Sequence, residues 1–269
     1  MIKREFVDPE FIELVDANNE ELLFENLWSR EDPWFEEPNI GRRDSKKAWS
    51  GVSRIIFKGN TFFLKKQENY FSYSVQPPLR QLLVEKEYSN IQLFKSYNIP
   101  CLDFVYFGVR KMPGGILGKT QGILITKALD NYLPLDKVQA NFWEAQGAEY
   151  QTIRKAIITS LAALVAQTHK SGLMHRCLYP KHIYIDKDFC ETGEQKTFDP
   201  VCRFIDLESA RKMPYKSTKQ LRDLETLNRR SPSTSLGDKL YFLLKYLNKN
   251  RLDKDVRQLI ERIKKISRV

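Results

Sequence analysis

The chain is poor in the residues that define metal-binding and disulfide-rich proteins. Its 269 residues include three histidines and four cysteines. The cysteines are Cys101, Cys177, Cys190 and Cys202, and no two of them have the C-x-x-C spacing that is typical of zinc sites and redox pairs. We therefore expect free thiols in a reducing compartment, and neither a zinc site nor a disulfide framework.

The sequence also lacks a long hydrophobic run and a secretory signal. The longest nearly apolar stretch is 156–166, whereas a membrane-spanning helix needs about 20 apolar residues. The first six residues include Lys3, Arg4 and Glu5, so they do not form the apolar segment of a signal peptide. We expect a protein on the cytoplasmic side of the membrane, free or peripheral.

What the chain does have is an ordinary globular composition with uneven charge. Hydrophobic residues make up 42%, charged residues 29%, and the net charge is +10, which excludes a wholly disordered or collagen-like chain. Residues 1–37 carry 12 acids and 3 bases, whereas 211–269 carry 17 bases and 6 acids. The basic end predicts a polyanionic partner, either acidic lipid, phosphate-rich glycan or nucleic acid. The absence of aromatic residues interleaved with the basic ones argues against nucleic acid.

The order of predicted elements indicates an α+β protein in three parts. Residues 1–48 form an acidic N-terminal extension, 49–129 a small antiparallel sheet with one helix, and 130–269 a mainly helical part with basic C-terminal helices. The predicted strands are 49–58, 61–66, 104–107, 122–126, 183–185 and 202–205, with a two-residue turn at Gly59-Asn60. The predicted helices are 82–97, 153–169, 221–230, 238–248 and 253–267.

A small sheet with one helix, followed by a helical half with a short strand pair, is the element order of a protein kinase. A kinase holds the α- and β-phosphates with a lysine on its third strand, and a glutamate on the following helix holds that lysine. Lys65 ends the strand in the place of the V-A-I-K lysine, and Glu87 lies on the next helix. We predict an ion pair between them; if Lys66 points inward instead, the register is off by one.

A second group of motifs lies in the helical half. The segment 175–182 reads His-Arg-Cys-Leu-Tyr-Pro-Lys-His and follows an apolar helix, where a kinase has its H-R-D-L-x-x-x-N catalytic loop. Asp206 follows the next strand, in Ile-Asp-Leu-Glu, at the place of the kinase D-F-G aspartate. A carboxylate there would hold Mg²⁺ that bridges the β- and γ-phosphates, and Glu208 could assist.

These motifs resemble those of the lipopolysaccharide core kinase family, the Kdo/WaaP-like group, and most of all its InaA branch. The resemblance runs from Trp49 to Arg230, and the block 177–182 is its most specific piece. It implies a protein-kinase-like bilobal fold, with ATP and Mg²⁺ as cofactors. It also implies a phosphotransferase acting on a sugar hydroxyl, heptose or Kdo, of the lipopolysaccharide core or another lipid-linked glycan. The implied location is the cytoplasm of a Gram-negative bacterium, with a peripheral place on the inner face of the inner membrane.

Carried over by position, the family pattern assigns six site residues. Arg176 and Cys177 take the catalytic positions, Lys65, Glu87 and Asp206 bind the nucleotide, and Asp206 with His182 binds the metal. His175 is expected to be a structural hydrogen-bonding residue, and Asp223 to brace the catalytic loop.

The sequence departs from the kinase pattern at three places. Cys177 replaces the catalytic aspartate, and His182 replaces the metal-binding asparagine although Mg²⁺ prefers oxygen ligands. There is no G-x-G-x-x-G loop. Gly41 and Gly51 instead flank four cations, Arg42, Arg43, Lys46 and Lys47, which are one hypothesis for phosphate binding.

Two functions therefore stay open. Retention of Lys65, Glu87 and Asp206 favours a kinase. Loss of the aspartate at Cys177 favours a pseudokinase, which binds nucleotide or acts as a scaffold. In the kinase interpretation, a neighbouring cation such as Arg176 would lower the pKa of the thiol and give a thiolate able to accept a proton.

The C-terminal helix allows two interpretations. Val256, Leu259, Ile260, Ile263 and Ile266 recur at helical spacing, with basic residues between them. The helix therefore either closes the larger lobe with a buried apolar stripe or contacts an anionic surface such as the inner membrane.

Overall fold

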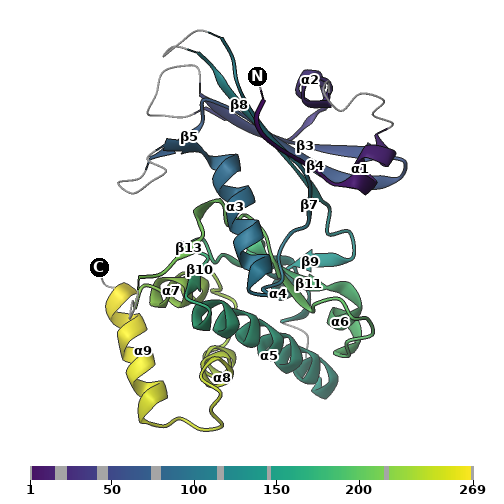
Figure 1. Cartoon of the computed structure of the whole chain (residues 1–269). Coiled ribbons are helices and arrows are strands. Elements are labelled where there is room, and N and C mark those ends of the chain that lie inside the picture. The colour runs from purple at the N-terminus through teal and green to yellow at the C-terminus, as the bar shows by residue number, and fades with distance from the viewer. Residues whose placement is uncertain are drawn as a thin grey trace. The chain divides into compact units, whose positions relative to one another are not determined.

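The computed structural model describes residues 2–15, 23–40, 48–73, 80–113, 118–143, 147–214 and 218–267, the side chains of 2–4, 40, 142 and 267 excepted. The chain divides into two compact units. The first contains Met1–Ile91 and Leu102–Ala128, and the second contains Gln92–Cys101 and Leu129–Val269. The predicted combination of an antiparallel sheet and a helical region is confirmed (Figure 1).

The first unit is built on a six-stranded antiparallel sheet of order β1-β7-β8-β4-β3-β2. Its strands are β1 (Ile2–Val7), β2 (Trp34–Ile40), β3 (Trp49–Phe57), β4 (Asn60–Glu68), β7 (Phe104–Lys111) and β8 (Thr120–Lys127). A two-stranded sheet, β5 (Phe71–Tyr73) with β6 (Arg80–Leu82), leads into helix α3 (Leu83–Ser96). The predicted helix over 82–97 is confirmed, and it ends where Asn98 takes a left-handed φ of 53° two residues before Pro100.

The hairpin of β3 and β4 is confirmed, but its turn lies one residue earlier than predicted. Phe57 pairs with Asn60, so the two turn residues are Lys58 and Gly59. Both have positive φ, 45° and 82°, as a type I′ turn requires. Glycine therefore occupies the second turn position, where it meets no steric resistance, and Asn60 is the first residue of β4.

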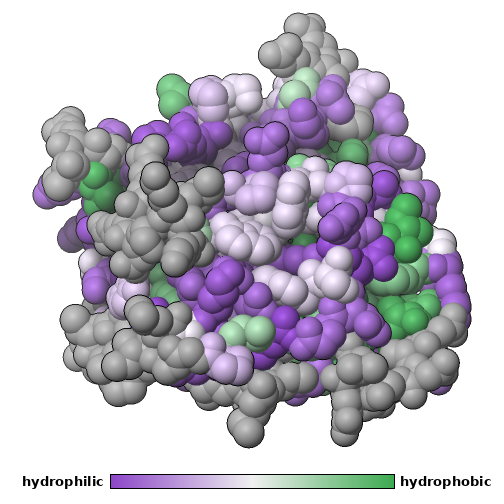
Figure 2. Space-filling view, turned by 90° about the horizontal axis from the view of Figure 1, so that it is seen from above, coloured by the Kyte–Doolittle hydropathy of each residue, from purple (hydrophilic) through white to green (hydrophobic). Residues whose placement is uncertain are grey.

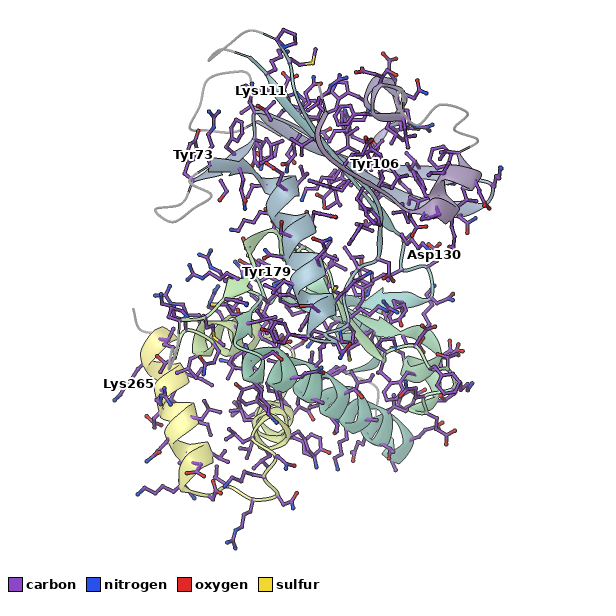
Figure 3. The ribbon with its side chains drawn as sticks, in the orientation of Figure 1. Tyr73, Tyr106, Lys111, Asp130, Tyr179 and Lys265 are labelled. Atoms are coloured by element: carbon purple, nitrogen blue, oxygen red, sulfur yellow. The ribbon has the colours of Figure 1, made fainter. Side chains whose placement is uncertain are left out.

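The acidic N-terminal segment is part of the first unit's core. It supplies both edge strands of the sheet, since β1 pairs with β7 and β2 with β3. It also supplies α1 (Pro9–Leu14) and α2 (Leu23–Ser29), whose Phe11 and Phe24 are fully buried. These rings pack in one cluster with Phe62, Leu64 and Tyr106 of the sheet. Side chains of this layer fill the region around Tyr106 in Figure 3.

The described residues seen in Figure 2 are mainly purple to white, hydrophilic to intermediate, and green is confined to small areas. The exposed apolar residues include Phe35 and Ile56, at 61% and 57% exposure. Phe35 packs edge-on against Phe63, with ring centroids 5.0 Å apart.

The second unit is mainly helical, as predicted. Its helices are α4 (Leu135–Phe142), α5 (Ala148–Lys170), α6 (Lys187–Thr192), α7 (Leu221–Arg229), α8 (Leu236–Tyr246) and α9 (Lys254–Ser267), with 3₁₀ turns at Pro180–His182 and Leu207–Ser209. The strands are β9 (Tyr132–Pro134), β11 (Ile183–Asp186) and β12 (Cys202–Phe204) in one sheet, and β10 (Leu173–Met174) paired with β13 (Arg211–Lys212). None of the helices in these described ranges is long and apolar enough to cross a membrane.

Helix α9 buries its apolar stripe within the second unit. Val256 is fully buried, and Leu259 and Ile263 are 7% exposed. The basic residues between them are exposed, and Lys265 points away from the helix in Figure 3. The first interpretation of this helix, closure of the larger lobe, is confirmed for the apolar side.

Candidate functional site

The first unit contributes a lysine–glutamate pair, as predicted. Lys65 lies on β4 and its Nζ donates to Oε2 of Glu87 on α3 at 2.8 Å. The lysine side chain is 18% exposed and the glutamate 6%. The pair therefore holds an ammonium group at a fixed place on one face of the sheet while leaving it in partial contact with solvent.

Lys66 takes the opposite face of the same strand, because side chains alternate along β4. It is 5% exposed, and its Nζ donates to the backbone carbonyls of Trp28 at 2.9 Å and Arg30 at 2.7 Å. Burial lowers the pKa of Lys66, and the nearby carboxylate of Asp32 opposes that shift. The predicted register is thus correct: Lys65 meets the glutamate, and Lys66 holds the end of α2.

In the second unit, Asp223 braces the 175–182 loop. Its carboxylate is 1% exposed and accepts the backbone N–H of His175 at 2.7 Å and that of Arg176 at 2.8 Å. Arg176 has a left-handed φ of 68°, which a non-glycine residue adopts only when its surroundings fix it. The bracing role predicted for Asp223 is confirmed.

Asp223 has a third partner that the sequence did not suggest. His169 at the end of α5 lies with Nε2 3.3 Å from the Asp223 carboxylate and Nδ1 2.9 Å from the hydroxyl of Tyr246 on α8. A carboxylate oxygen accepts, so the Nε2–H of His169 donates to Asp223, and Nδ1 shares a hydrogen bond with the tyrosine hydroxyl. A hydrogen-bonded chain therefore runs from α8 through α5 to the loop.

His175 ties the loop to the strand end that carries Asp206. Its Nε2 donates to the carbonyl of Ile205 at 3.0 Å. Burial lowers the pKa of His175, so the ring is neutral, and it has no exposed edge for chemistry. The expected structural role is confirmed.

His182 and Asp206, the two residues assigned to the metal, lie in direct contact. His182 Nδ1 donates to the carbonyl of Cys177 at 2.9 Å, so Nε2 faces Oδ2 of Asp206 at 3.3 Å. Asp206 itself has a left-handed φ of 56° and is one-third exposed. A ring nitrogen and a carboxylate oxygen at this separation can ligate one cation together. No group of three or more His, Cys, Asp or Glu side chains suited to a metal occurs within the described ranges.

Cys177 does not have the environment of a thiolate. Burial raises its pKa, and the carboxylates of Asp206 and Glu208 raise it further, against a hydrogen bond with Ser209 and the charge of Arg176. The expectation of a lowered pKa is therefore wrong: desolvation outweighs the neighbouring cation, and the thiol stays protonated at neutral pH. All four cysteines are free, as predicted.

The other phosphate-binding hypothesis lies outside the described residues. Arg42, Arg43, Lys46 and Lys47 all fall in 41–47, between β2 and β3. Gly51 is described and lies against the ring of Trp34, so its place reflects packing under an aromatic side chain.

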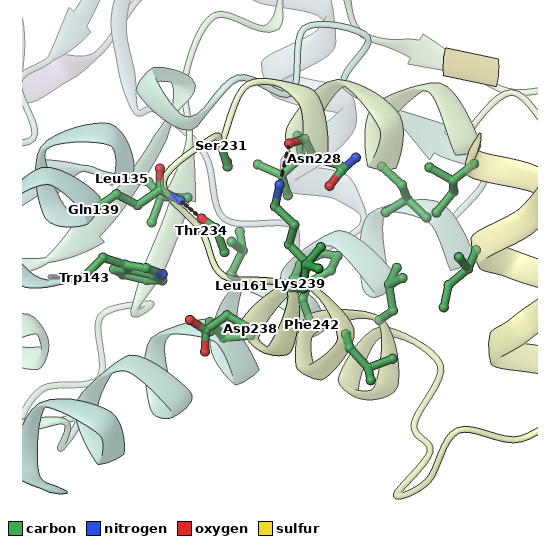
Figure 4. Close-up of a pocket in the computed structure, with 18 of the residues that line it drawn as sticks. Leu135, Gln139, Trp143, Leu161, Asn228, Ser231, Thr234, Asp238, Lys239 and Phe242 are labelled. Carbon is green, nitrogen blue, oxygen red and sulfur yellow. Dashed lines mark hydrogen bonds between the residues drawn. The ribbon is translucent and has the colours of Figure 1, made fainter. Parts of the chain in front are cut away.

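An apolar cavity of about 270 Å³ lies among the helices of the second unit. Leucines and isoleucines of α4, α5, α7, α8 and α9 line most of it (Figure 4). Gln139 donates to Thr234 at its wall, and Lys239 donates to the carbonyl of Asn228. The indole N–H of Trp143 and the hydroxyl of Ser231 are buried there without a partner. Periodicity in the sequence predicts apolar helix faces, but not that they leave a space.

Comparisons with known proteins agree with this arrangement. The chain is 24% identical to protein InaA of Escherichia coli (strain K12) over 193 residues, which are 70% of this chain and 79% of InaA. Its fold resembles the solved structure of WaaP in complex with acyl carrier protein, with a TM-score of 0.64, 16% identity and 98% of each chain covered. The family model for the lipopolysaccharide kinase (Kdo/WaaP) family matches residues 25–261. With a protein-kinase-like fold and a match over most of its length, the chain belongs to the lipopolysaccharide kinase (Kdo/WaaP) family.

Proposed function

We propose that the protein is an ATP-dependent phosphotransferase that acts on a sugar hydroxyl, heptose or Kdo, of the lipopolysaccharide core. The observation that carries this proposal is the Lys65–Glu87 pair, at 2.8 Å and largely buried. A scaffold has no chemical need for an ammonium group held in this way. A kinase uses such a group to bind the phosphates of the nucleotide.

The residues that would hold a divalent cation are Asp206 and His182. Their neighbouring carboxylate oxygen and ring nitrogen fit a cation. Mg²⁺ prefers oxygen ligands, so a site with one ring nitrogen suits Mn²⁺ at least as well as Mg²⁺. When bound, the cation would neutralise charge on the β- and γ-phosphates. Asp223 and His175 hold the loop and the strand end that carry these two ligands.

Because the thiol of Cys177 is protonated, we propose that catalysis depends mainly on positioning of the reactants. Phosphoryl transfer passes through a loose transition state, so placement of the reactants and stabilisation of charge do most of the work. A general base contributes about 10²–10⁴ where one is present. We therefore propose a slow kinase in which Cys177 and Arg176 shape the acceptor side of the loop.

Ligand-dependent thermal stability and phosphate transfer test the proposal. ATP with Mg²⁺ or Mn²⁺ should raise the melting temperature of the wild type more than ATP or cation alone, and [γ-³²P]ATP should label purified lipopolysaccharide core. Lys65→Ala and Asp206→Asn should remove both effects. Lys58→Ala, which removes an exposed lysine in the turn between β3 and β4, is the control and should behave as wild type. Full labelling by Lys65→Ala would refute the assignment.

The pseudokinase remains the second candidate because of Cys177. The kinase proposal expects Cys177→Ala to keep most of the wild-type rate, since a protonated thiol accepts no proton. A wild type without transfer and a Cys177→Asp variant that gains it would identify a kinase that has lost its base. Binding of ATP with no transfer by any of the three proteins would favour the scaffold.

We further propose an acyl carrier protein as a partner. The solved WaaP is in complex with an acyl carrier protein. The apolar cavity of the second unit is lined by residues that suit an acyl chain. An acylated carrier protein should raise the melting temperature more than the same carrier without its acyl group. Leu243→Trp, which fills the cavity, should remove that difference, and an unchanged difference would count against the cavity.

We also propose that the exposed cations of α9 contact the anionic inner face of the inner membrane. Lys254, Arg257, Arg262 and Lys265 are exposed, and each cation near an acidic bilayer contributes about 1 kcal/mol. The protein should float with vesicles that contain anionic lipid and not with neutral ones. Equal recovery with both would end the electrostatic proposal.

A further inference from the structure

Three arginines beside the 175–182 loop have no acidic partner among the residues that the structure describes. Arg176 lies in the loop, Arg211 on β13 and Arg222 in the first turn of α7, and all three are exposed. None of them makes an ion pair or a side-chain hydrogen bond with any residue that the structure describes. Arg229, on the same helix as Arg222, by contrast pairs with Glu225 at 3.0 Å.

The backbone brings these three residues to one place. Arg211 pairs with Met174 across the β10–β13 ladder, and Arg176 lies two residues beyond Met174. The N–H of Arg176 donates to Asp223, which directly follows Arg222 on α7. Figure 1 shows β10, β13 and α7 side by side. The pKa of Arg211 is lowered, first by partial burial and then by the positive charges of Arg176 and Arg222, which places the three guanidinium groups within electrostatic range of one another.

Such a cluster is suited to one class of ligand. Each guanidinium presents a planar fork of N–H donors that matches phosphate or carboxylate oxygens, and it loses little hydration when it binds. Because Asp223 fixes the backbone of Arg176, less conformational entropy of this residue is lost when a ligand binds. An anionic group bound among the three would relieve their mutual repulsion.

We propose that Arg176, Arg211 and Arg222 form a binding site for a phosphate or carboxylate group of the acceptor glycan. The site lies next to Cys177, so it would hold an anionic substituent near the hydroxyl that is phosphorylated. The identity of the ligand as an acceptor rests on the proposed function, whereas the anion site itself does not.

The first experiment measures anion binding alone. Inorganic phosphate is titrated at constant ionic strength, with chloride as the reference, into the wild type, Arg211→Gln and Arg222→Gln. Each substitution should weaken phosphate binding about ten-fold, as expected for loss of a charged hydrogen bond. Arg257→Gln removes an exposed arginine from α9 and should bind like the wild type. No phosphate binding by the wild type, or equal weakening in Arg257→Gln, would overturn the site.

The second experiment identifies the source of the anion. With lipopolysaccharide core as the acceptor, Arg211→Gln and Arg222→Gln should raise KM for the core and leave kcat and KM for ATP unchanged. Removal of the core's phosphates by phosphatase should raise the wild-type KM and abolish the difference between variants. A phosphorylated side chain of the protein itself, found by intact mass only when the arginines are present, would overturn the assignment to the acceptor. If no protein in the series transfers phosphate, the proposed function fails and the phosphate titration alone decides the site.

Discussion

Replacement of Asp223 by asparagine should destabilise the second unit strongly, although the two side chains have the same shape. The carboxylate accepts N–H groups from His175 at 2.7 Å, from Arg176 at 2.8 Å and from His169 at 3.3 Å. The asparagine amide has one acceptor oxygen and an NH₂ group, so at least one N–H must face a donor. A hydrogen bond to a charged group contributes about 1.5–3 kcal/mol, and an unsatisfied buried donor costs about 1–3 kcal/mol. We expect a loss of about 3–5 kcal/mol in the free energy of unfolding.

Urea denaturation measures this loss of stability in Asp223→Asn and in a matched control, Asp136→Asn. Asp136 lies on α4 in the same unit and is exposed, and its carboxylate accepts the N–H of Lys137 at 3.0 Å. Asp136→Asn removes the same charge and should change the free energy by less than about 0.5 kcal/mol. Amide exchange should be faster at His175 and Arg176 in Asp223→Asn. If the two variants lose equal stability, the carboxylate does not hold the loop and the reasoning is refuted.

Three further predictions concern buried polar groups. Tyr246→Phe should accelerate amide exchange in the 175–182 loop two- to ten-fold, as expected for loss of one hydrogen bond of about 1 kcal/mol. The control Tyr241→Phe removes a hydroxyl bonded to Thr159 and should leave exchange in that loop unchanged. Equal exchange rates in the two variants would show that the hydrogen-bonded chain through His169 is not coupled to the loop. Lys66→Met should cost about 2 kcal/mol in urea denaturation because the partly buried carbonyls of Trp28 and Arg30 lose their donor. A cost no larger than that of Lys58→Met would mean that water replaces the ammonium group. Above pH 9 the free energy of unfolding should fall, because burial raises the pKa of Cys190 to about 12 while the thiol of the unfolded chain ionises near its ordinary pKa. The folded state then binds more protons than the unfolded state, and this thiol contributes a slope of about 1.4 kcal/mol per pH unit. A Cys190→Ala variant with the same slope as the wild type would contradict the assignment.

The sequence predicted the elements that have strong periodicity or clear punctuation. The helix over 82–97 and the hairpin of 49–66 were found because their apolar spacing and turn residues are local signals. The hairpin turn was placed one residue late because Gly-Asn is itself a good turn pair. The register of β3 against β4, in which Phe57 pairs with Asn60, decides between the two positions.

The first 40 residues show where local signals end. Their acids and aromatic residues lack a clear alternation, so two strands of the main sheet were not predicted. The buried Lys66 was missed for the same reason. Lys65 and Lys66 are adjacent and have the same side chain. Only the packing of α2 on one face of β4 makes Lys66 a buried charge.

The site residues were predicted by position, and their protonation was not. The Lys65–Glu87 pair and the Asp223 brace follow from motif spacing that a shared fold preserves. The pKa of Cys177 depends on how deeply the loop is buried, and a sequence does not give that depth. The adjacent Arg176 suggested a thiolate, but desolvation of the thiol acts in the opposite direction and is the larger effect.

The pairing of β1 with β7 has a consequence for synthesis. Phe6 pairs with Phe107, so β1 has no partner on β7 until about a hundred more residues have been made. Contacts of such long sequence separation form slowly, and an unpaired strand edge favours aggregation in the meantime. The high negative charge of residues 1–37 would keep this waiting segment soluble by repulsion between nascent chains. The acidic segment would thus protect the chain during translation and then close both edges of the sheet.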